Sequence, residues 1–163
     1  MMKITPVVKN LLIINVLLHV SLSLAGGEEI KYAMMAFYPS GETGLFYPWQ
    51  IITHMFLHGD IGHIAFNMIG LYIFGSYLER LWGGKKFLIF YMTCGLASYF
   101  LHEFANGVQI HMACGSFFPD ASVLAEQVNP GDFKVNPAFW ASPALGASGA
   151  VLGLVMGFAV LFP

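Results

Sequence analysis

Long, unbroken apolar runs alternate with shorter polar segments along this chain. Four of the runs approach the length of a membrane helix, because about 20 predominantly apolar residues cross the hydrocarbon core of a bilayer. The pattern predicts helices at about 9–25, 61–78, 87–104 and 145–162. The runs are continuous and do not alternate residue by residue, which favours helices over the strands of a membrane barrel. We therefore expect an all-α, polytopic transmembrane helical bundle.

Two long segments connect these runs. Residues 26–60 carry acidic groups and many aromatic residues interrupted by proline and glycine. Trp and Tyr favour the headgroup level of a bilayer, so we expect this loop to lie partly in the membrane interface. Residues 105–143 contain prolines and acidic residues without a sustained helical period, and we expect a long external loop there. Loops longer than about 12–15 residues are often functional.

The first apolar run has two interpretations. Lys3 and Lys9 lie at its start, and the run ends in Ser23-Leu24-Ala25, the small-x-small pattern of a signal-peptide cleavage site. Three further apolar runs follow, which favours retention of this segment as a membrane helix.

Composition agrees with a membrane protein of one domain, residues 1–163. The chain is 57% hydrophobic and 10% charged, whereas soluble domains have about 25% charged residues. The lipid bilayer is therefore the expected environment. The net charge is −2 and no basic block is present, so nucleic acid is not an expected partner. The two cysteines do not make a disulfide framework.

The basic residues predict the orientation in the membrane. Cytoplasmic segments carry an excess of Lys and Arg. One side would hold five basic residues and the other two: Lys3, Lys9, Arg80, Lys85 and Lys86, against Lys31 and Lys134. The N-terminus is thus expected in the cytoplasm, and the fourth helix is expected to start on the external side. Ser148 would then lie in the outer leaflet.

The fourth helix begins with a serine between small residues, Gly146-Ala147-Ser148-Gly149. A serine in this position is either a packing device or a nucleophile, and a hydroxyl bonded back to its own helix is the structural alternative. Gly149, Gly153 and Gly157 follow at four-residue intervals. They form a flat ridge that lets another helix approach closely.

The second helix carries His63 and Asn67. Four residues of helix correspond to about 400° of rotation and about 6 Å of rise, so both side chains share one face. Polar groups inside a membrane helix are functional candidates by default. The alternative is a polar clamp in which both side chains bond to a neighbouring backbone.

A metal site is a further possibility, built on His54 and His58 with Asp60 or His63. Gly59 and Gly62 should interrupt the helix there, and no glutamate beside the pair supplies the usual base of a zinc hydrolase. We therefore expect no metal and no cofactor.

Taken together, these motifs resemble the rhomboid family of intramembrane serine proteases. The resemblance covers about Trp49 to the end of the chain and rests on Gly-x-Ser-Gly at a helix start, on the spacing of three polar residues, and on the Glu79-Arg80-x-x-Gly83 turn. The three spaced residues are His58, His63 and Asn67. The loop that ends at Pro48-Trp49 is similar to the family's membrane-embedded first loop.

The resemblance implies a role for each matched residue. Ser148 would be the nucleophile, His63 and Asn67 would help to bind the oxyanion, and His58 and Glu79 would be structural. It also implies six helices, transmembrane proteins as substrates, cleavage near the external side, and the bacterial inner (plasma) membrane as location.

One part of the family pattern is missing. The catalytic base of rhomboids is a histidine on the sixth helix in an Ala-His-x-x-Gly setting. Five histidines lie elsewhere: His19, His54, His58, His102 and His111. We therefore interpret the chain as a truncated rhomboid with four of six helices. The alternative is a non-catalytic, rhomboid-like scaffold that binds transmembrane segments. Two further apolar runs after Pro163, with a histidine in the second, would favour the protease.

Overall fold

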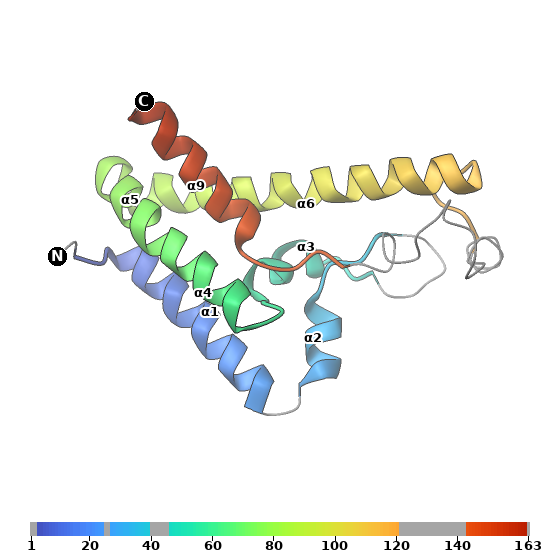
Figure 1. Cartoon of the computed structure of the whole chain (residues 1–163), viewed down its shortest axis with the longest axis horizontal. Coiled ribbons are helices and arrows are strands. Elements are labelled where there is room, and N and C mark those ends of the chain that lie inside the picture. The colour runs from blue at the N-terminus through green and yellow to red at the C-terminus, as the bar shows by residue number, and fades with distance from the viewer. Residues whose placement is uncertain (1–2, 25–26, 40–45, 121–142, 163) are drawn as a thin grey trace.

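The computed structural model describes residues 3–24, 27–39, 46–120 and 143–162. These residues form an all-helical bundle, as the apolar runs predict (Figure 1). Its elements are α1 (Pro6–Leu24), α2 (Glu28–Met34), α3 (Gln50–Thr53), η1 (His54–Phe56), α4 (Ile61–Gly70), η2 (Leu71–Gly75), α5 (Ser76–Trp82), α6 (Gly84–Cys114) and α9 (Ser148–Leu161).

Three helical units within the described residues are long and apolar enough to cross a membrane. They are α1, the continuous unit Ile61–Trp82 made of α4, η2 and α5, and α6. The expected fourth spanning helix, α9, is apolar but has 14 residues. At 1.5 Å per residue it rises about 21 Å, less than the hydrocarbon core of about 30 Å.

Helix α9 starts at Ser148 rather than at 145. The reason is Gly146, whose φ of 109° is incompatible with a right-handed helix. The residues just before Ser148 therefore form a turn, and the serine opens the helix.

Helix α6 is much longer than the predicted 87–104, so residues 105–114 are helix and not loop. The helical period continues because Tyr99, Glu103, Asn106 and Ile110 recur on one buried face. The helix ends where Gly115 adopts a left-handed conformation with φ 72°. The part of the predicted loop at 121–142 lies outside the described residues.

The second helical unit continues to Trp82, four residues beyond its predicted end. Gly83, with φ 78°, ends it and leads directly into α6. Between α4 and α5 the helix widens into a π-helical turn, η2, which the apolar pattern does not predict. Such turns insert one extra residue and often occur near functional sites.

The predicted loop 26–60 contains short helices among its described residues. Phe37 and Tyr38 are buried, whereas Tyr47 and Trp49 are exposed and their rings stack with centroids 4.6 Å apart. The indole Nε1 of Trp49 donates to the carbonyl of Ala33 in α2, 2.9 Å away, which joins the two ends of this segment. Its position in the membrane interface stays a prediction.

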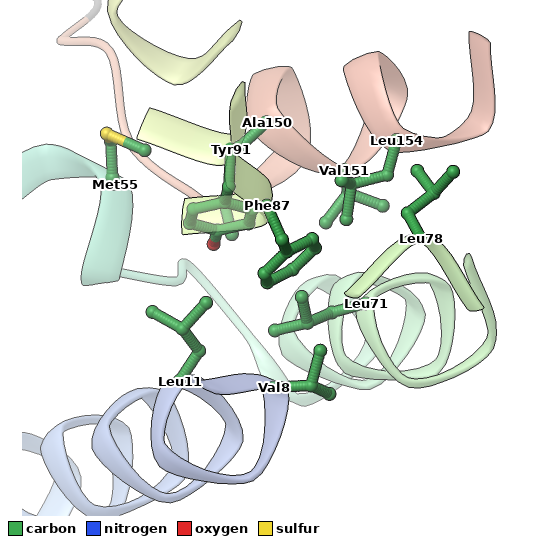
Figure 2. Close-up of a cluster of buried hydrophobic side chains, with 11 residues drawn as sticks. Val8, Leu11, Met55, Leu71, Leu78, Phe87, Tyr91, Ala150, Val151 and Leu154 are labelled. Carbon is green, nitrogen blue, oxygen red and sulfur yellow. The ribbon is translucent and has the colours of Figure 1, made fainter. Parts of the chain in front are cut away.

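The apolar core lies where α1, the α4–α5 unit, α6 and α9 meet. Figure 2 shows Val8 and Leu11 of α1 facing Leu71 of η2, with Phe87 of α6 between them and α9. Val151 closes the cluster from α9. These side chains are buried, so the four helical units share one core.

The glycine ridge of α9 faces α6. A Cβ on Gly149 would lie 2.3 Å from the Ser98 side chain, and one on Gly153 would lie 2.5 Å from Cys94 Sγ. A Cβ on Gly157 would lie 3.2 Å from Phe90. The missing side chains therefore allow α9 to pack directly against α6.

Glu79 joins α5 to the start of α1. Its carboxylate accepts hydrogen bonds from the backbone N–H of Val7 at 3.0 Å and of Val8 at 2.9 Å, and from the Thr5 hydroxyl. These backbone donors belong to the unsatisfied first turn of α1. Arg80 also donates to the carbonyl of Lys3. The N-terminus and the turn after α5 thus lie at the same end of the bundle, as the basic residues predict.

Candidate active site

The turn before α9 is held by backbone hydrogen bonds to distant parts of the chain. Ala144 and Ala36 form an isolated antiparallel bridge, with N–O distances of 2.8 and 3.0 Å. The N–H of Gly146 then donates to the carbonyl of His54 at 2.8 Å. These bonds fix the path of the chain into Ser148, the first residue of α9.

His63 lies in the first turn of α4, close to this turn. Asp60 caps the helix, and its Oδ1 accepts the backbone N–H of His63 at 2.8 Å. A Cβ built on Gly146 would lie 2.7 Å from His63 Nε2 and 3.6 Å from Ser148 Oγ. The imidazole and the hydroxyl therefore approach the same point beside Gly146, where only glycine fits.

Asn67 lies one turn further along α4 and is buried. Its Nδ2 donates to the backbone carbonyl of His63 at 3.0 Å. This bond lies within α4, so it is not a clamp to a neighbouring helix. Asn67 itself does not line the cavity described below.

A cavity of about 410 Å³ opens at Ser148. This volume falls within the usual range of ligand pockets, about 300–1,000 Å³. Its lining comes from η1, the start of α4, the turn before α9, and α6: His54, Gly59, His63, Gly95, Ser98, Tyr99, His102, Pro143, Ala144, Leu145, Gly146, Ser148 and Gly149. The sequence-predicted Ser148, His63, Gly146 and Gly149 thus meet at one cavity.

His58 lies behind His63, and its side chain is 1% exposed. The two rings meet edge to face with centroids 5.1 Å apart, and the His19 ring lies 6.4 Å away on the other side. Burial lowers the pKa of His58 to about 4, with smaller contributions from the charges that His63 and His19 would carry. Its position agrees with a structural role.

The groups that could form the alternative metal cluster have hydrogen-bond partners of their own. His54 Nδ1 lies 2.8 Å from the carbonyl of Gln50, and burial is the main cause that lowers the pKa of His54. The hydrogen bond from the His63 backbone is the main cause that lowers the pKa of the exposed Asp60. Among the described residues no group of three His, Cys, Asp or Glu side chains is arranged to hold a metal ion.

Five of the predicted residues do not line the cavity, and three residues of α6 that line it were missed: the five are His58, Asn67, Glu79, Gly153 and Gly157. Glu79, Gly153 and Gly157 serve helix packing, as described above. The α6 side of the cavity comes from residues that the motif search did not single out: Ser98, Tyr99 and His102. The spacing of Ser98 and His102, one helical turn apart in an apolar run, is the signal that marks this wall.

Comparison with known proteins agrees with this arrangement. A family model described as the rhomboid domain matches residues 46–163. The chain is 25% identical to rhomboid protease GlpG of Haemophilus influenzae over 164 residues, which cover 88% of this chain and 84% of that protein.

Two further relatives are longer proteins. RHOMBOID-like protein 12, mitochondrial, of Arabidopsis thaliana is 33% identical over 65% of this chain and 27% of its own length. Rhomboid protease GluP of Bacillus subtilis is 30% identical over 51% of this chain and 17% of its own length. Since the family model covers most of the chain and the apolar helices agree with it, this integral membrane protein belongs to the rhomboid family.

Proposed function

We propose that this protein is an intramembrane serine endopeptidase in which Ser148 is the nucleophile. The observation that carries the proposal is that Ser148, His63 and the turn at Gly146 converge on one cavity at the start of α9. Ser148 Oγ would attack the carbonyl carbon of a peptide bond, and negative charge would develop on the carbonyl oxygen.

The donors for that oxyanion come from two helices. The backbone N–H of Ser148 is among the first four of α9, which have no partner within the helix, and it lies at the positive end of the helix dipole. His63 Nε2 approaches the same turn. Removal of one such donor typically costs about 2.7–4 kcal/mol of transition-state stabilisation. Asn67 would have to turn its amide away from the His63 carbonyl to take part.

A serine also needs a base to accept its proton at neutral pH. The family resemblance assigns this role to a histidine on a sixth helix. His63 is the proposed donor to the oxyanion. A second histidine would therefore accept the proton of the Ser148 hydroxyl. The protein expressed from its full coding sequence is therefore the material for every assay of activity.

The proposed substrates are membrane proteins with a single transmembrane helix. A regular helix hides its carbonyls in hydrogen bonds, so cleavage would favour segments that unwind easily near the external end of the span. We place the protein in the bacterial plasma membrane with its N-terminus in the cytoplasm, since the basic residues gather at the end where α1 starts and α5 ends.

The test is cleavage of a model single-pass substrate in proteoliposomes. Ser148→Ala should abolish cleavage, because it removes the hydroxyl that lies beside Gly146 at the start of α9. Ser23→Ala is the matched control, since this membrane-helix hydroxyl only donates back to the His19 carbonyl at 2.8 Å. Unchanged cleavage by Ser148→Ala would show that the assigned nucleophile is wrong.

A non-catalytic scaffold that binds transmembrane segments is the second candidate. A scaffold would retain a bound transmembrane segment through purification and never release a shortened product. Ser148→Ala would then leave the binding of that segment unchanged.

A further inference from the structure

The imidazole of His58, behind His63, is buried without a hydrogen-bond partner. Its side chain is 1% exposed, and neither ring nitrogen is hydrogen-bonded to a group of the described residues. The backbone of Phe56 lies near the ring but outside hydrogen-bond geometry. Buried polar groups of native proteins are nearly always paired, either with protein groups or with ordered water. The ring therefore needs a partner that the described residues around it do not supply.

A small cavity adjoins this ring where it faces α1. Its volume of about 20 Å³ has room for one water molecule, since a buried water needs about 10–15 Å³. His19 and His58 line it, and Glu28 and Lys31 of α2 add charged groups to its lining. The side chain of Glu28 is 71% exposed, so water can enter from the surface of the protein. The cavity is thus polar, accessible and large enough for a single water.

The His19 and His58 rings are spaced for a bridge through that water. They meet edge to face with centroids 6.4 Å apart, and no direct hydrogen bond joins them. Two hydrogen bonds of about 2.9 Å each, with one water between them, span such a separation. A neutral imidazole has one donor and one acceptor nitrogen, and a water can pair with either. The bridge would join α1 to the segment that leads into α4.

This segment also determines which nitrogen of His63 carries the proton. The backbone N–H of Gly59, the residue after His58, donates to His63 Nδ1 at 3.4 Å. The bond is long, so a small shift of the segment would break it. A neutral imidazole whose Nδ1 accepts a hydrogen bond carries its proton on Nε2. Nε2 is the nitrogen that approaches the turn at Gly146 beside Ser148.

We propose that one water molecule bridges His19 to His58, and that this bridge holds the Gly59 amide on His63, so that Nε2 keeps its proton for the oxyanion. The inference rests on the proposed function. His19 and His58 act through His63 and are positioning residues. Loss of the bridge would release the segment 58–59, and the proton of His63 would then distribute between Nδ1 and Nε2.

The first experiment measures kcat and KM for a model single-pass substrate in proteoliposomes, with the protein expressed from its full coding sequence. His19→Leu should lower kcat about tenfold, which corresponds to about 1.4 kcal/mol or one hydrogen bond, and should change KM less than about twofold. His19→Gln keeps a donor and an acceptor and should retain at least about a third of kcat. An unchanged kcat in His19→Leu, or an equal loss in His19→Gln, would overturn the inference.

His111→Leu is the matched control for this exchange. The His111 ring stacks on Phe117 with centroids 4.5 Å apart and lines neither of the two cavities. Its replacement should leave kcat unchanged. A loss as large as that in His19→Leu would contradict the inference, because it would show that the effect does not depend on the place of the histidine.

The second experiment observes the tautomer of His63 by solid-state NMR. The histidines are isotope-labelled, and the imidazole signals of His63 are assigned by their loss in His63→Ala. We expect the Nε2–H tautomer in the unaltered protein at neutral pH and a mixture of both tautomers in His19→Leu. The Nδ1–H tautomer in the unaltered protein, or an unchanged tautomer in His19→Leu, would refute the assignment.

Further readouts separate this inference from the proposed function. Fluorophosphonate labelling of Ser148 and cleavage by the unaltered protein test the nucleophile, so the absence of both would contradict the proposed function. A labelled, active protein in which His19→Leu changes neither kcat nor the tautomer contradicts only the bridge. If His19→Leu does not fold, a crystal structure of the full protein decides. One water within hydrogen-bond distance of both rings would support the bridge, and its absence there would overturn it.

Discussion

Replacement of Gly153 by alanine tests the packing of α9 on α6. The new Cβ would lie 2.5 Å from Cys94 Sγ and 2.6 Å from Cys94 Cβ. Optimal carbon contacts are about 3.5–4.0 Å, so the helices must separate by about 1 Å. The position of Cys94 Cβ is fixed by its backbone and offers no rotation that relieves the contact.

The expected magnitude follows from two opposing effects. Overpacking of this kind costs about 1–3 kcal/mol, whereas alanine gains about 0.5–1 kcal/mol over glycine in a helix. We expect a net destabilisation of about 1–2 kcal/mol. Gly157→Ala is the matched control in the same helix, because its nearest neighbour is the end of the Phe90 ring at 3.2 Å. That ring can move, so the change should be near zero.

The assay is reversible unfolding by SDS titration in mild detergent, followed by tryptophan fluorescence. The double variant Gly153→Ala, Cys94→Gly removes the opposing atoms and should restore stability relative to the sum of the single variants by at least about 1 kcal/mol. If Gly153→Ala is as stable as Gly157→Ala, or if the double variant shows no coupling, the proposed contact is wrong.

Three further predictions concern the ends of the helices and the histidines. Glu79→Ala should cost about 1–3 kcal/mol in the same SDS titration, since it leaves the first-turn amides of α1 without acceptors; the exposed Glu29→Ala should change little. Gly146→Ala should reduce cleavage at least about tenfold with unfolding unchanged within about 2 kcal/mol, because its Cβ meets His63 and its φ is 109°; full activity would contradict the site geometry. Because burial lowers the pKa of His58 from 6.5 to about 4, the folded state binds this proton less readily than the unfolded state, so stability should be full above pH 6.5 and fall between pH 6.5 and about 4. With allowance for solvent screening the loss is about 2 kcal/mol, and His58→Phe should remove it.

The apolar pattern predicted the helical bundle because in lipid the backbone must satisfy its own hydrogen bonds. It misplaced the end of α6 because polar residues and a glycine interrupt the apolar run beyond Phe104. Glu103 and Asn106 nevertheless fall on the buried face together with Ile110. Hydropathy measures transfer into lipid and not burial against protein, so this extension was invisible to it. Gly115 is the local signal for the true end.

The position of Ser148 at the start of α9 was predictable from the residues next to it. Gly146 and Gly149 flank Ser148 because one needs a positive φ and the other allows close contact with α6. The role of Asp60 was not predictable from its neighbours, since the histidines beside it also match a metal cluster. Its role as the cap of α4 depends on where that helix begins.

The α6 wall of the cavity was missed for a different reason. His102 lies more than 40 positions before Ser148 in the sequence, and only the packing of α9 on α6 brings both to one cavity. The spacing of residues within one helix does not indicate which residues of other helices will line the same cavity. The glycine ridge predicts that some helix packs there, but it does not identify α6.

The most direct test of the account is the site of covalent modification by a serine-reactive fluorophosphonate. The protein expressed from its full coding sequence would be treated in membranes, digested, and analysed by mass spectrometry. We predict one adduct, on Ser148 Oγ with loss of fluoride, and its disappearance after prior denaturation. An adduct on another serine together with intact cleavage activity would contradict the assignment of Ser148 as the nucleophile.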